Sequence, residues 1–246
     1  MTIPLTGSVG EGGANHPSDV QAVQQRLSAL GYTWVAVDGN IGPLTIKAIR
    51  LFQAIKNGDQ TVSVAHNDGK IDVGGDTHKW LEATNAPRWQ LMPPGSVGDG
   101  FVNIEVADLN DDHDFGTDWF AAFVTAAGQH YRDNYRVINP TSAVITVNDA
   151  SRPQGGDTQD HSGHETGLSC DLRLPLTDGT SPAGTTFLTA NFDRAAARAI
   201  LNAFRTQPLF SLAYFNDPTL IAEGLCLPQA GHENHLHVQM RPPLRA

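Results

Sequence analysis

The sequence has only two cysteines among its 246 residues, too few for the disulfide framework of a small secreted domain. It has no run of about 18 apolar residues, so we expect no membrane span and no membrane partner. Basic side chains are also scarce: there are 16 against 26 acidic ones, for a formal net charge of −10. Binding to nucleic acid without sequence preference needs a basic face, and this charge balance excludes it.

Lysine is absent from the second part of the chain, which indicates a division. Residues 1–90 carry 7 basic and 8 acidic side chains, whereas residues 91–246 carry 9 and 18. Residues 86–100 contain three prolines and three glycines, a composition typical of a linker. We therefore predict a first domain over 1–88, a linker over 89–100 and a second domain over 101–246.

Several catalytic motifs are missing as well. No His-Glu-x-x-His occurs, and no phosphate-binding Gly-x-x-x-x-Gly-Lys loop is present. The segment around Ser169 lacks the final glycine of a nucleophile elbow. Cys170 is best read as a small packed residue, although a pair with Cys226 stays open. These absences exclude the common zincin, nucleotide-binding and serine-hydrolase patterns.

Residues 1–88 show helical periodicity. Apolar residues recur from Val20 to Leu30, with Ser18 as a candidate N-cap, and again from Pro43 to Ile55. The glycine turn at residues 37–42 is followed later by a similar sequence at 67–74. A short helical stretch over 77–81 comes after it. The pattern predicts a small helical bundle built by partial internal repetition.

These residues resemble the three-helix peptidoglycan-binding module that accompanies cell-wall hydrolases. The resemblance covers about residues 8–84 and rests on these segments: Asp19-Val20, Gln24-x-x-Leu27, Leu30-Gly-Tyr32, Val37-Asp-Gly-x-Ile-Gly-x-x-Thr45, Ala48-Ile49-x-x-Phe52-Gln53, Asp68-Gly69 and Trp80-Leu81. It implies that the first domain binds the wall. Asp38, Gly39, Gly42 and Thr45 are explained mainly as turn and cap residues, so the resemblance does not identify glycan contacts.

The second domain mixes helices and strands without regular alternation, which favours an α+β fold with a central antiparallel sheet. The sequence predicts helices over 118–131 and 195–204. It predicts strands over 143–147, 209–215 and 235–240, where β-branched and aromatic residues are frequent.

Histidines gather in two segments of this domain. The first holds His161, His164 and Asp171, and the second is Gly231-His-Glu-Asn-His-Leu-His-Val238. On a strand, His235 and His237 share one face, with Gln239 next in line. Two neighbouring imidazoles repel when protonated, and a metal ion relieves that conflict. The sequence therefore predicts a metal site.

His164, Asp171 and His237 offer two nitrogens and one carboxylate oxygen, a set that suits zinc (Zn²⁺) with an open fourth position. Such a site activates water and polarises a carbonyl. His235 is a candidate general base or oxyanion stabiliser, and Glu233 is a rival base.

The same residues resemble the penicillin-insensitive murein endopeptidases, within the superfamily of lysostaphin-type and D-Ala-D-Ala zinc peptidases. The match spans about residues 140–242 and is carried by Asp149-Ala-Ser-Arg-Pro-Gln-Gly-Gly156, His161-x-x-His164-x-x-Gly167-x-x-x-Asp171, Phe215-Asn-Asp-Pro218 and His232-x-x-His235-x-His237. It implies that His164, Asp171 and His237 bind zinc and that His235 is catalytic. It further implies that His161 adds to the metal site, His232 contacts substrate and Arg152 orients it. Ser162, Gly163 and Gln239 depart from the expected pattern.

Together these features predict a monomeric peptidoglycan hydrolase that cleaves D-Ala–meso-diaminopimelate cross-links. An L-Ala–D-Glu peptidase, a D-Ala-D-Ala carboxypeptidase and a non-catalytic wall-binding protein with a structural metal stay open. Residues 1–7 lack the plan of a secretory signal. We therefore expect either a phage-type endolysin, reaching the wall through a membrane lesion, or a processed secreted enzyme.

An acidic stretch over 105–118 has the opening spacing of a calcium loop at Asp108, Asn110 and Asp112. However, His113 occupies the position that needs glycine, so a solvated acidic loop is the better interpretation. Trp89 and Trp119 are expected to be packing residues.

Overall fold

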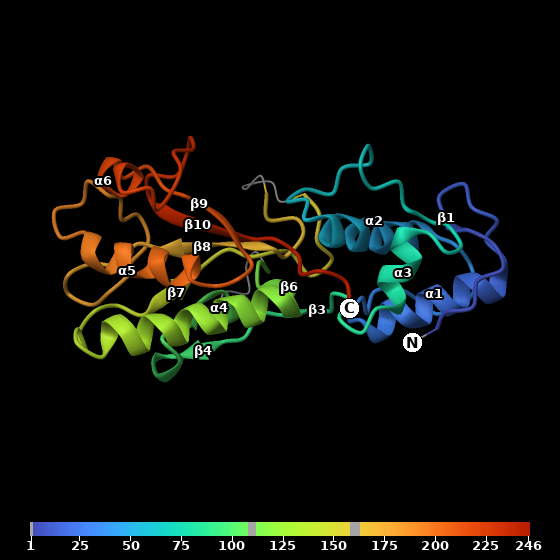
Figure 1. The fold of residues 1–246 in the computed structure, drawn as a ribbon, viewed down its shortest axis with the longest axis horizontal. Helices are drawn as coiled ribbons and strands as arrows, with labels where there is room; N and C mark the ends of the chain where they lie inside the picture. Colours follow the sequence, from blue (N-terminus) through green and yellow to red (C-terminus); the bar gives the residue numbers. More distant parts are fainter. Residues whose placement is uncertain (1, 108–111, 158–162) are drawn as a thin grey trace.

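The computed structural model describes residues 2–107, 112–157 and 163–246. The molecule is elongated, with a helical part at one end and a sheet with covering helices at the other (Figure 1). The elements of the helical part are β1 (Val9–Gly10), α1 (Pro17–Ala29), α2 (Pro43–Asn57), β2 (Lys70–Ile71) and α3 (Asp76–Glu82). The remainder of the described chain combines helices with one large and one small sheet, in agreement with an α+β class.

Helices α1 and α2 begin at a proline, whose fixed φ suits the first helical position. The N-cap of α1 is His16 and no side chain caps it, so the expectation that Ser18 caps this helix is wrong. With Pro17 as its first residue, the helix begins two residues earlier than a Ser18 cap would place it. Asp19 instead accepts hydrogen bonds from the backbone and side chain of Thr6 and from Gly7 N. Gly58 ends α2 in the left-handed conformation, as its position after Asn57 predicts.

Two buried glutamines show the internal repetition directly. The amide of Gln24 donates to Asp38 Oδ1 and Asn40 O at 2.9 Å, and its oxygen accepts from Gly39 N at 2.8 Å. Gln53 repeats this arrangement with its own turn: it donates to Asp68 Oδ1 at 2.8 Å and Lys70 O at 2.9 Å, and accepts from Gly69 N at 2.8 Å. Each helix thus ties down the glycine turn that follows it.

The large sheet has the strand order β4-β5-β7-β8-β10-β9. Its neighbouring strands are antiparallel except β5 and β7, which are parallel, so the expected antiparallel sheet is in fact mixed. The parallel pair arises because α4 and the turn after it connect these two strands as a crossover. The strands are β4 (Gly95–Ser96), β5 (Phe101–Asn103), β7 (Ile145–Val147), β8 (Ser169–Arg173), β9 (Phe210–Tyr214) and β10 (His235–Met240).

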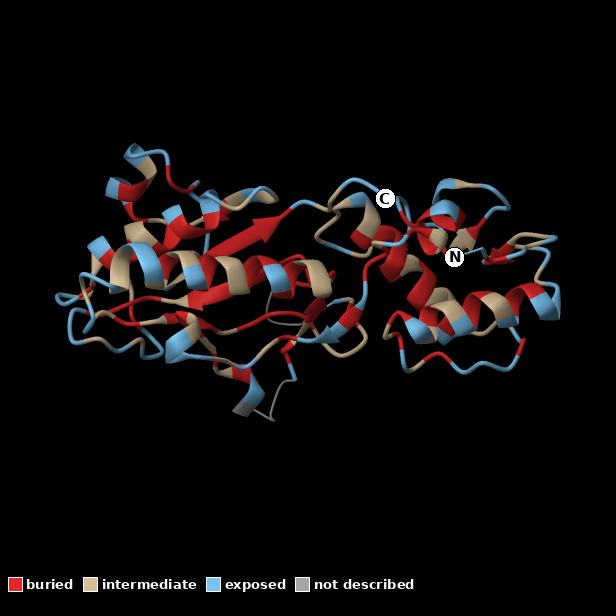
Figure 2. Ribbon diagram, turned by 60° about the horizontal axis from the view of Figure 1, so that its bottom comes forward, coloured by how far each residue is buried: buried red, intermediate tan, exposed pale blue. Residues whose placement is uncertain are grey.

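Helices α4 (Asp118–Tyr131) and α5 (Arg194–Arg205) lie on one side of this sheet (Figure 1). Phe123 and Phe204 join them, with ring centroids 5.4 Å apart. Figure 2 shows buried residues along the sheet and the inner sides of the helices, and exposed ones on their outer faces. The remaining elements are the short helix α6 (Pro218–Ala222), the 3-10 turns η1 (Val97–Asp99) and η2 (Glu105–Ala107), and the π-helical turn η3 (Arg132–Arg136). No helix among the described residues is both long and apolar enough to cross a membrane.

The segment 89–100, expected to be a linker, is built into sheets. Residues Trp89–Leu91 form β3, which pairs antiparallel with β6 (Phe115–Thr117), and β4 lies at the edge of the large sheet. Trp89 N also donates to Leu30 O at 2.8 Å. Gly31 allows this approach, because a Cβ there would come within 2.0 Å of Trp89 O.

Several contacts hold the helical part against the sheet-containing part. Trp80 of α3 packs on Trp119 of α4, with centroids 5.8 Å apart, and Trp89 Nε1 donates to Pro153 O at 2.7 Å. Both Trp89 and Trp119 are thus packing residues, as expected. The chain returns after β10, and Thr84 N donates to Ala246 O at 3.0 Å. The two parts are packed together through these side chains and backbone pairs.

Candidate metal centre

Strands β8 and β10 set up the site through their register. His237 lies directly opposite Asp171, and His235 lies opposite Arg173. Because opposite residues of an antiparallel pair share a face, these four side chains lie on one face of the sheet. The alternate residues Leu236 and Val238 are fully buried on the other face. The predicted strand over 235–240 is confirmed, with the same bounds.

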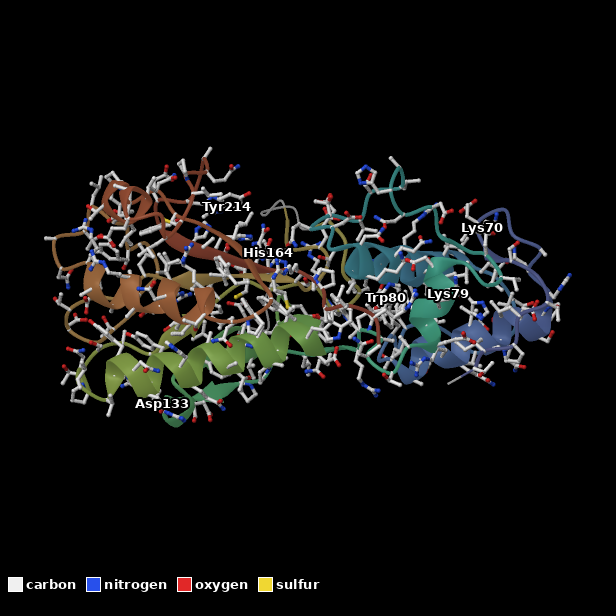
Figure 3. All side chains as sticks on the ribbon, viewed as in Figure 1. Lys70, Lys79, Trp80, Asp133, His164 and Tyr214 are labelled. Atoms are coloured by element: carbon white, nitrogen blue, oxygen red, sulfur yellow. The ribbon has the colours of Figure 1, made fainter. Side chains whose placement is uncertain are left out.

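His164 reaches the same place from the loop that precedes β8. The backbone oxygen of His164 accepts from Ser151 Oγ, which itself accepts from Gly167 N at 2.7 Å. The neighbouring Glu165 accepts from Val62 N at 2.6 Å through Oε2. The loop that carries His164 is therefore fixed both to the sheet-containing part and to the helical part. Figure 3 shows His164 between Tyr214 and the helical part, while Trp80 lies at the junction.

The side chains of His164, Asp171 and His237 form a compact donor group. His164 Nε2 lies 3.3 Å and His237 Nδ1 2.8 Å from Asp171 Oδ1. One ligand atom from each residue lies within 4.8 Å of the others, and all three residues are at most 3% exposed. Two imidazole nitrogens and a carboxylate oxygen converging in this way can bind a metal ion, and the donor set is one that zinc accepts.

The charges of this group depend on one another. Burial opposes ionisation of Asp171, but the charge of His164 and hydrogen bonds from both histidines hold the pKa of its carboxyl well below the usual range. For His164, burial lowers the pKa, yet the negative Asp171 outweighs it and the net shift is upward. Burial dominates at His237 and lowers its pKa to about 4. His237 is therefore neutral at pH 7, the form in which a histidine binds a metal.

Two neighbours whose roles the sequence did not reveal hold the His237 ring. The Gln239 side-chain amide lies 2.9 Å from His237 Nε2, the nitrogen on the far side of the ring from Asp171. The Tyr214 ring on β9 lies 5.7 Å from the same imidazole, centroid to centroid. Alternation along β10 predicts that Gln239 lies on this face, and the tertiary structure brings its amide into contact with His237. Such outer contacts orient metal-binding histidines.

His235 and His232 lie beside the donor group. His235 Nε2 is 3.4 Å from Asp171 Oδ2, and its side chain is 20% exposed. The His232 ring lies 4.6 Å from that of His235 and 5.6 Å from that of His237. Glu233, the rival base, is exposed, and its Oε1 accepts from Asn216 at 2.9 Å. Of the two candidate bases, His235 has the described contact with the donor group.

Arg152 and His161 are the remaining residues that the sequence predicts at the site. The Nε of Arg152 donates to His113 Nε2 at 3.2 Å, and the side chain lines a separate pocket together with Lys47. The described contacts of Arg152 therefore do not include the donor group. His161, expected at the metal, lies outside the described residues, as do Asp108 and Asn110 of the acidic stretch.

Both cysteines are free thiols and buried. Cys170 is completely buried on β8, and burial raises its pKa well above the ordinary value. It therefore stays protonated and is a packing residue rather than a nucleophile. Cys226 is unpaired as well, which settles the open question of a Cys170–Cys226 bond.

A pocket of about 330 Å³ opens next to the donor group. Asp171 and His235 line it, and Arg173, Asn148 and Asp149 form more of its wall. The remaining lining residues are Pro182, Ala183, Gly184, Gly231 and Asn234. The donor group, although buried, thus adjoins a space large enough for part of a peptide.

Comparison with known families associates part of the chain with a described family. Residues 16–61 match the family model described as "Putative peptidoglycan binding domain". The matched range covers α1, α2 and the Gln24 turn between them, within the region where the sequence resembles a peptidoglycan-binding module. A comparison with curated proteins found no match to the chain. The comparisons therefore associate the helical part with peptidoglycan and the cell wall.

Proposed function

We propose that this protein is a peptidoglycan hydrolase whose sheet-containing domain, residues 101–246, is a zinc peptidase. The observation that carries the proposal is the buried group of His164, Asp171 and His237 beside a pocket, with His235 adjacent to it. The peptidoglycan-binding match at residues 16–61 supports the choice of substrate. The proposal keeps residues 1–88 as the wall-binding domain.

The three buried residues would hold the zinc ion. Asp171 contributes the negative charge, and neutral His237 contributes a nitrogen lone pair at pH 7. When bound at such a site, zinc supplies a Lewis acid that activates water and polarises the scissile carbonyl. Gln239 and Tyr214 keep the His237 ring in place for this role.

His235 is the residue proposed to move protons. It is partly exposed at the pocket, and its Nε2 faces the Asp171 carboxylate at 3.4 Å. In hydrolysis, water oxygen bonds to the carbonyl carbon, the carbon–nitrogen bond breaks, and a proton passes from water to the leaving amine. An imidazole at the edge of the donor group can accept and return that proton. His232, stacked near His235, is proposed to contact the substrate.

The bond proposed is D-Ala–meso-diaminopimelate, as the resemblance to murein endopeptidases implies. Peptidoglycan is an insoluble polymer, and a binding domain raises the local concentration of its cross-links around the attached peptidase. The contacts across the junction, including Glu165 with Val62, join the helical part to the His164 loop, and this supports the proposed coupling of wall binding to cleavage. The enzyme is proposed to act at the cell wall as a monomer.

Replacing His235 by Ala tests the assignment. We expect a loss of hydrolysis of purified sacculi of about 100- to 10,000-fold, while zinc content and wall binding persist. Mass analysis of the released fragments identifies the bond cleaved by the unsubstituted protein. Glu233→Gln is the matched control and should retain activity. Unchanged hydrolysis in His235→Ala would overturn the catalytic role, and absence of hydrolysis with bound metal would favour a structural metal in a wall-binding protein.

A further inference from the structure

The pocket beside the donor group contains an arginine that the function described so far does not use. Arg173 follows Asp171 by two residues on β8, so its Cα lies about 7 Å along the strand on the same face. It lies directly opposite His235, while Asp171 lies opposite His237. A ligand group bound to Arg173 would therefore lie two residues along β8 from the Asp171 side of the donor group.

The charge of Arg173 has no carboxylate partner in the described part of the chain. The hydrogen bond described for its side chain runs from Nε to Asn148 Oδ1 at 2.8 Å, and this contact with a neutral amide holds the guanidinium at the pocket wall. None of the ion pairs among the described residues involves Arg173.

The two carboxylates that line the same pocket are engaged elsewhere. Asp171 contacts three histidines, and Asp149 accepts from Asn148 and faces His113 at 3.6 Å. The rim includes Gly184 and Gly231, where an added Cβ would meet no heavy atom within 4 Å. An anionic group can therefore enter the pocket and reach the guanidinium.

We propose that Arg173 binds a substrate carboxylate, the one on the carbon that also carries the leaving nitrogen. This proposal rests on the peptidase function above. In D-Ala–meso-diaminopimelate, in L-Ala–D-Glu and in D-Ala–D-Ala, that carbon bears a carboxyl group beside the scissile amide. Anchoring it on Arg173 directs the amide nitrogen past His235 and the carbonyl toward the donor group. A guanidinium suits this task because its planar fork matches a carboxylate.

The substrate class follows from this geometry. The enzyme should prefer peptides whose carboxyl next to the scissile amide is free, and it should discriminate against walls in which that carboxyl is amidated. A charge-assisted hydrogen bond corresponds to a preference of about 10- to 100-fold.

The test uses one cross-linked D-Ala–meso-diaminopimelate peptide in two forms, with the carboxyl beside the scissile amide free or amidated. For the full-length protein we expect kcat/KM to favour the free acid about 10- to 100-fold. Arg173→Gln should remove that preference by slowing the acid only, and Arg173→Lys should keep part of it. Arg241→Gln, an exposed change of the same charge, is the control. An acid preference that survives Arg173→Gln would overturn the proposal.

A binding measurement separates this proposal from the peptidase function itself. The same two peptides are titrated calorimetrically into the His235→Ala protein, with and without Arg173→Gln. Tighter binding of the acid that disappears with Arg173→Gln supports the carboxylate site even if no peptide is cleaved by the unsubstituted protein. Equal binding of acid and amide by the protein with Arg173 intact would refute the site even if cleavage is observed. Circular dichroism confirms that each variant is folded.

Discussion

Two buried polar clusters lie in different parts of this molecule and differ in how they are satisfied. In the helical part, the single amide of Gln24 makes hydrogen bonds with the turn that contains Asp38 and Gly39, using both its nitrogen and its oxygen. In the sheet-containing part, His164 and His237 both approach the same oxygen of Asp171. The first cluster pairs donors with acceptors, whereas the second brings three metal-binding groups to one point.

This difference separates structure from chemistry. A buried network with its hydrogen bonds made internally rigidifies a fold and leaves no atom for a ligand. A buried group with shifted pKa values, gathered beside a pocket, is a candidate for chemistry. The turn residues Asp38, Gly39 and Thr45 of the helical part thus act on the fold, as the sequence indicated, and the histidines are where a ligand is expected.

The largest expected effect comes from removing the charge of the second cluster. Asp171→Asn should lower hydrolysis of sacculi about 1,000-fold, because the loss of bound metal removes several kcal/mol of transition-state stabilisation. Metal analysis of the purified variant and fragment release from sacculi measure this. Wall binding should persist, and excess chelator should reproduce the loss in the unsubstituted protein. Asp133→Asn, at an exposed carboxylate, is the control. Full metal content in Asp171→Asn would contradict the donor assignment.

The next effect concerns stability rather than chemistry. Gln24→Ala should destabilise the protein by about 2–4 kcal/mol, because it leaves the buried Gly39 N–H and the buried Thr45 hydroxyl without their hydrogen-bond partner. Gln25, the next residue on α1, is exposed, so Gln25→Ala should change stability by less than about 0.5 kcal/mol. Denaturant unfolding of both variants measures the difference. Equal stability of the two would show that the Gln24 hydrogen bonds do not hold this turn.

A smaller effect is expected from removing the contact that the Gln239 amide makes with the metal-binding His237. Gln239→Leu keeps the donor group but removes the amide contact at His237 Nε2. Zinc affinity should fall about 10- to 100-fold, as for other outer contacts of metal-binding histidines. Competition with a chelator of known affinity gives the value. Gln90→Leu, at an exposed strand position, should leave it unchanged; a similar loss in both variants would rule out a specific role for Gln239.

The smallest effect is a pH dependence in the helical part. Burial opposes ionisation of Asp19, but hydrogen bonds from Thr6, Gly7 and His16 lower its pKa below the ordinary value of 3.8. A carboxyl whose pKa is lowered by folding stabilises the fold above that ordinary value and loses this contribution as pH falls through the folded pKa. The stability difference between the unsubstituted protein and Asp19→Asn should therefore be larger at pH 6 than at pH 2.5. A stability difference that is independent of pH would refute this role of the Asp19 carboxylate.

Local patterns predicted several elements accurately. The helix over 118–131 has the predicted bounds, and α5 extends the predicted 195–204 by one residue at each end. The strand over 235–240 was predictable because His235 and His237 alternate with buried Leu236 and Val238. The strand predicted over 143–147 is shorter, at Ile145–Val147. The elements that could be predicted from the sequence were thus those whose own side chains follow a clear helical or strand period.

Residues 89–100 show where local patterns fail. Their prolines and glycines are typical of a linker, yet Trp89–Leu91 pairs with Phe115–Thr117 and Trp89 packs between the two parts of the molecule. The partner of β3 lies far along the chain, and composition carries no information about a partner. Similarly, nothing in the spacing of Arg173 indicated that it would lie opposite His235.

The sequence by itself determined the helical periodicity of residues 1–88, the alternation of histidines near the C-terminus and the types of ligand that the second part offers. These are properties of neighbouring residues, set by backbone geometry and side-chain chemistry. Only the tertiary structure decided that His164, Asp171 and His237 meet, that Gln239 holds one of their rings and that Arg173 lies across from His235. The reason is that strand register and loop packing bring together residues that lie far apart in the sequence. No local pattern determines these contacts.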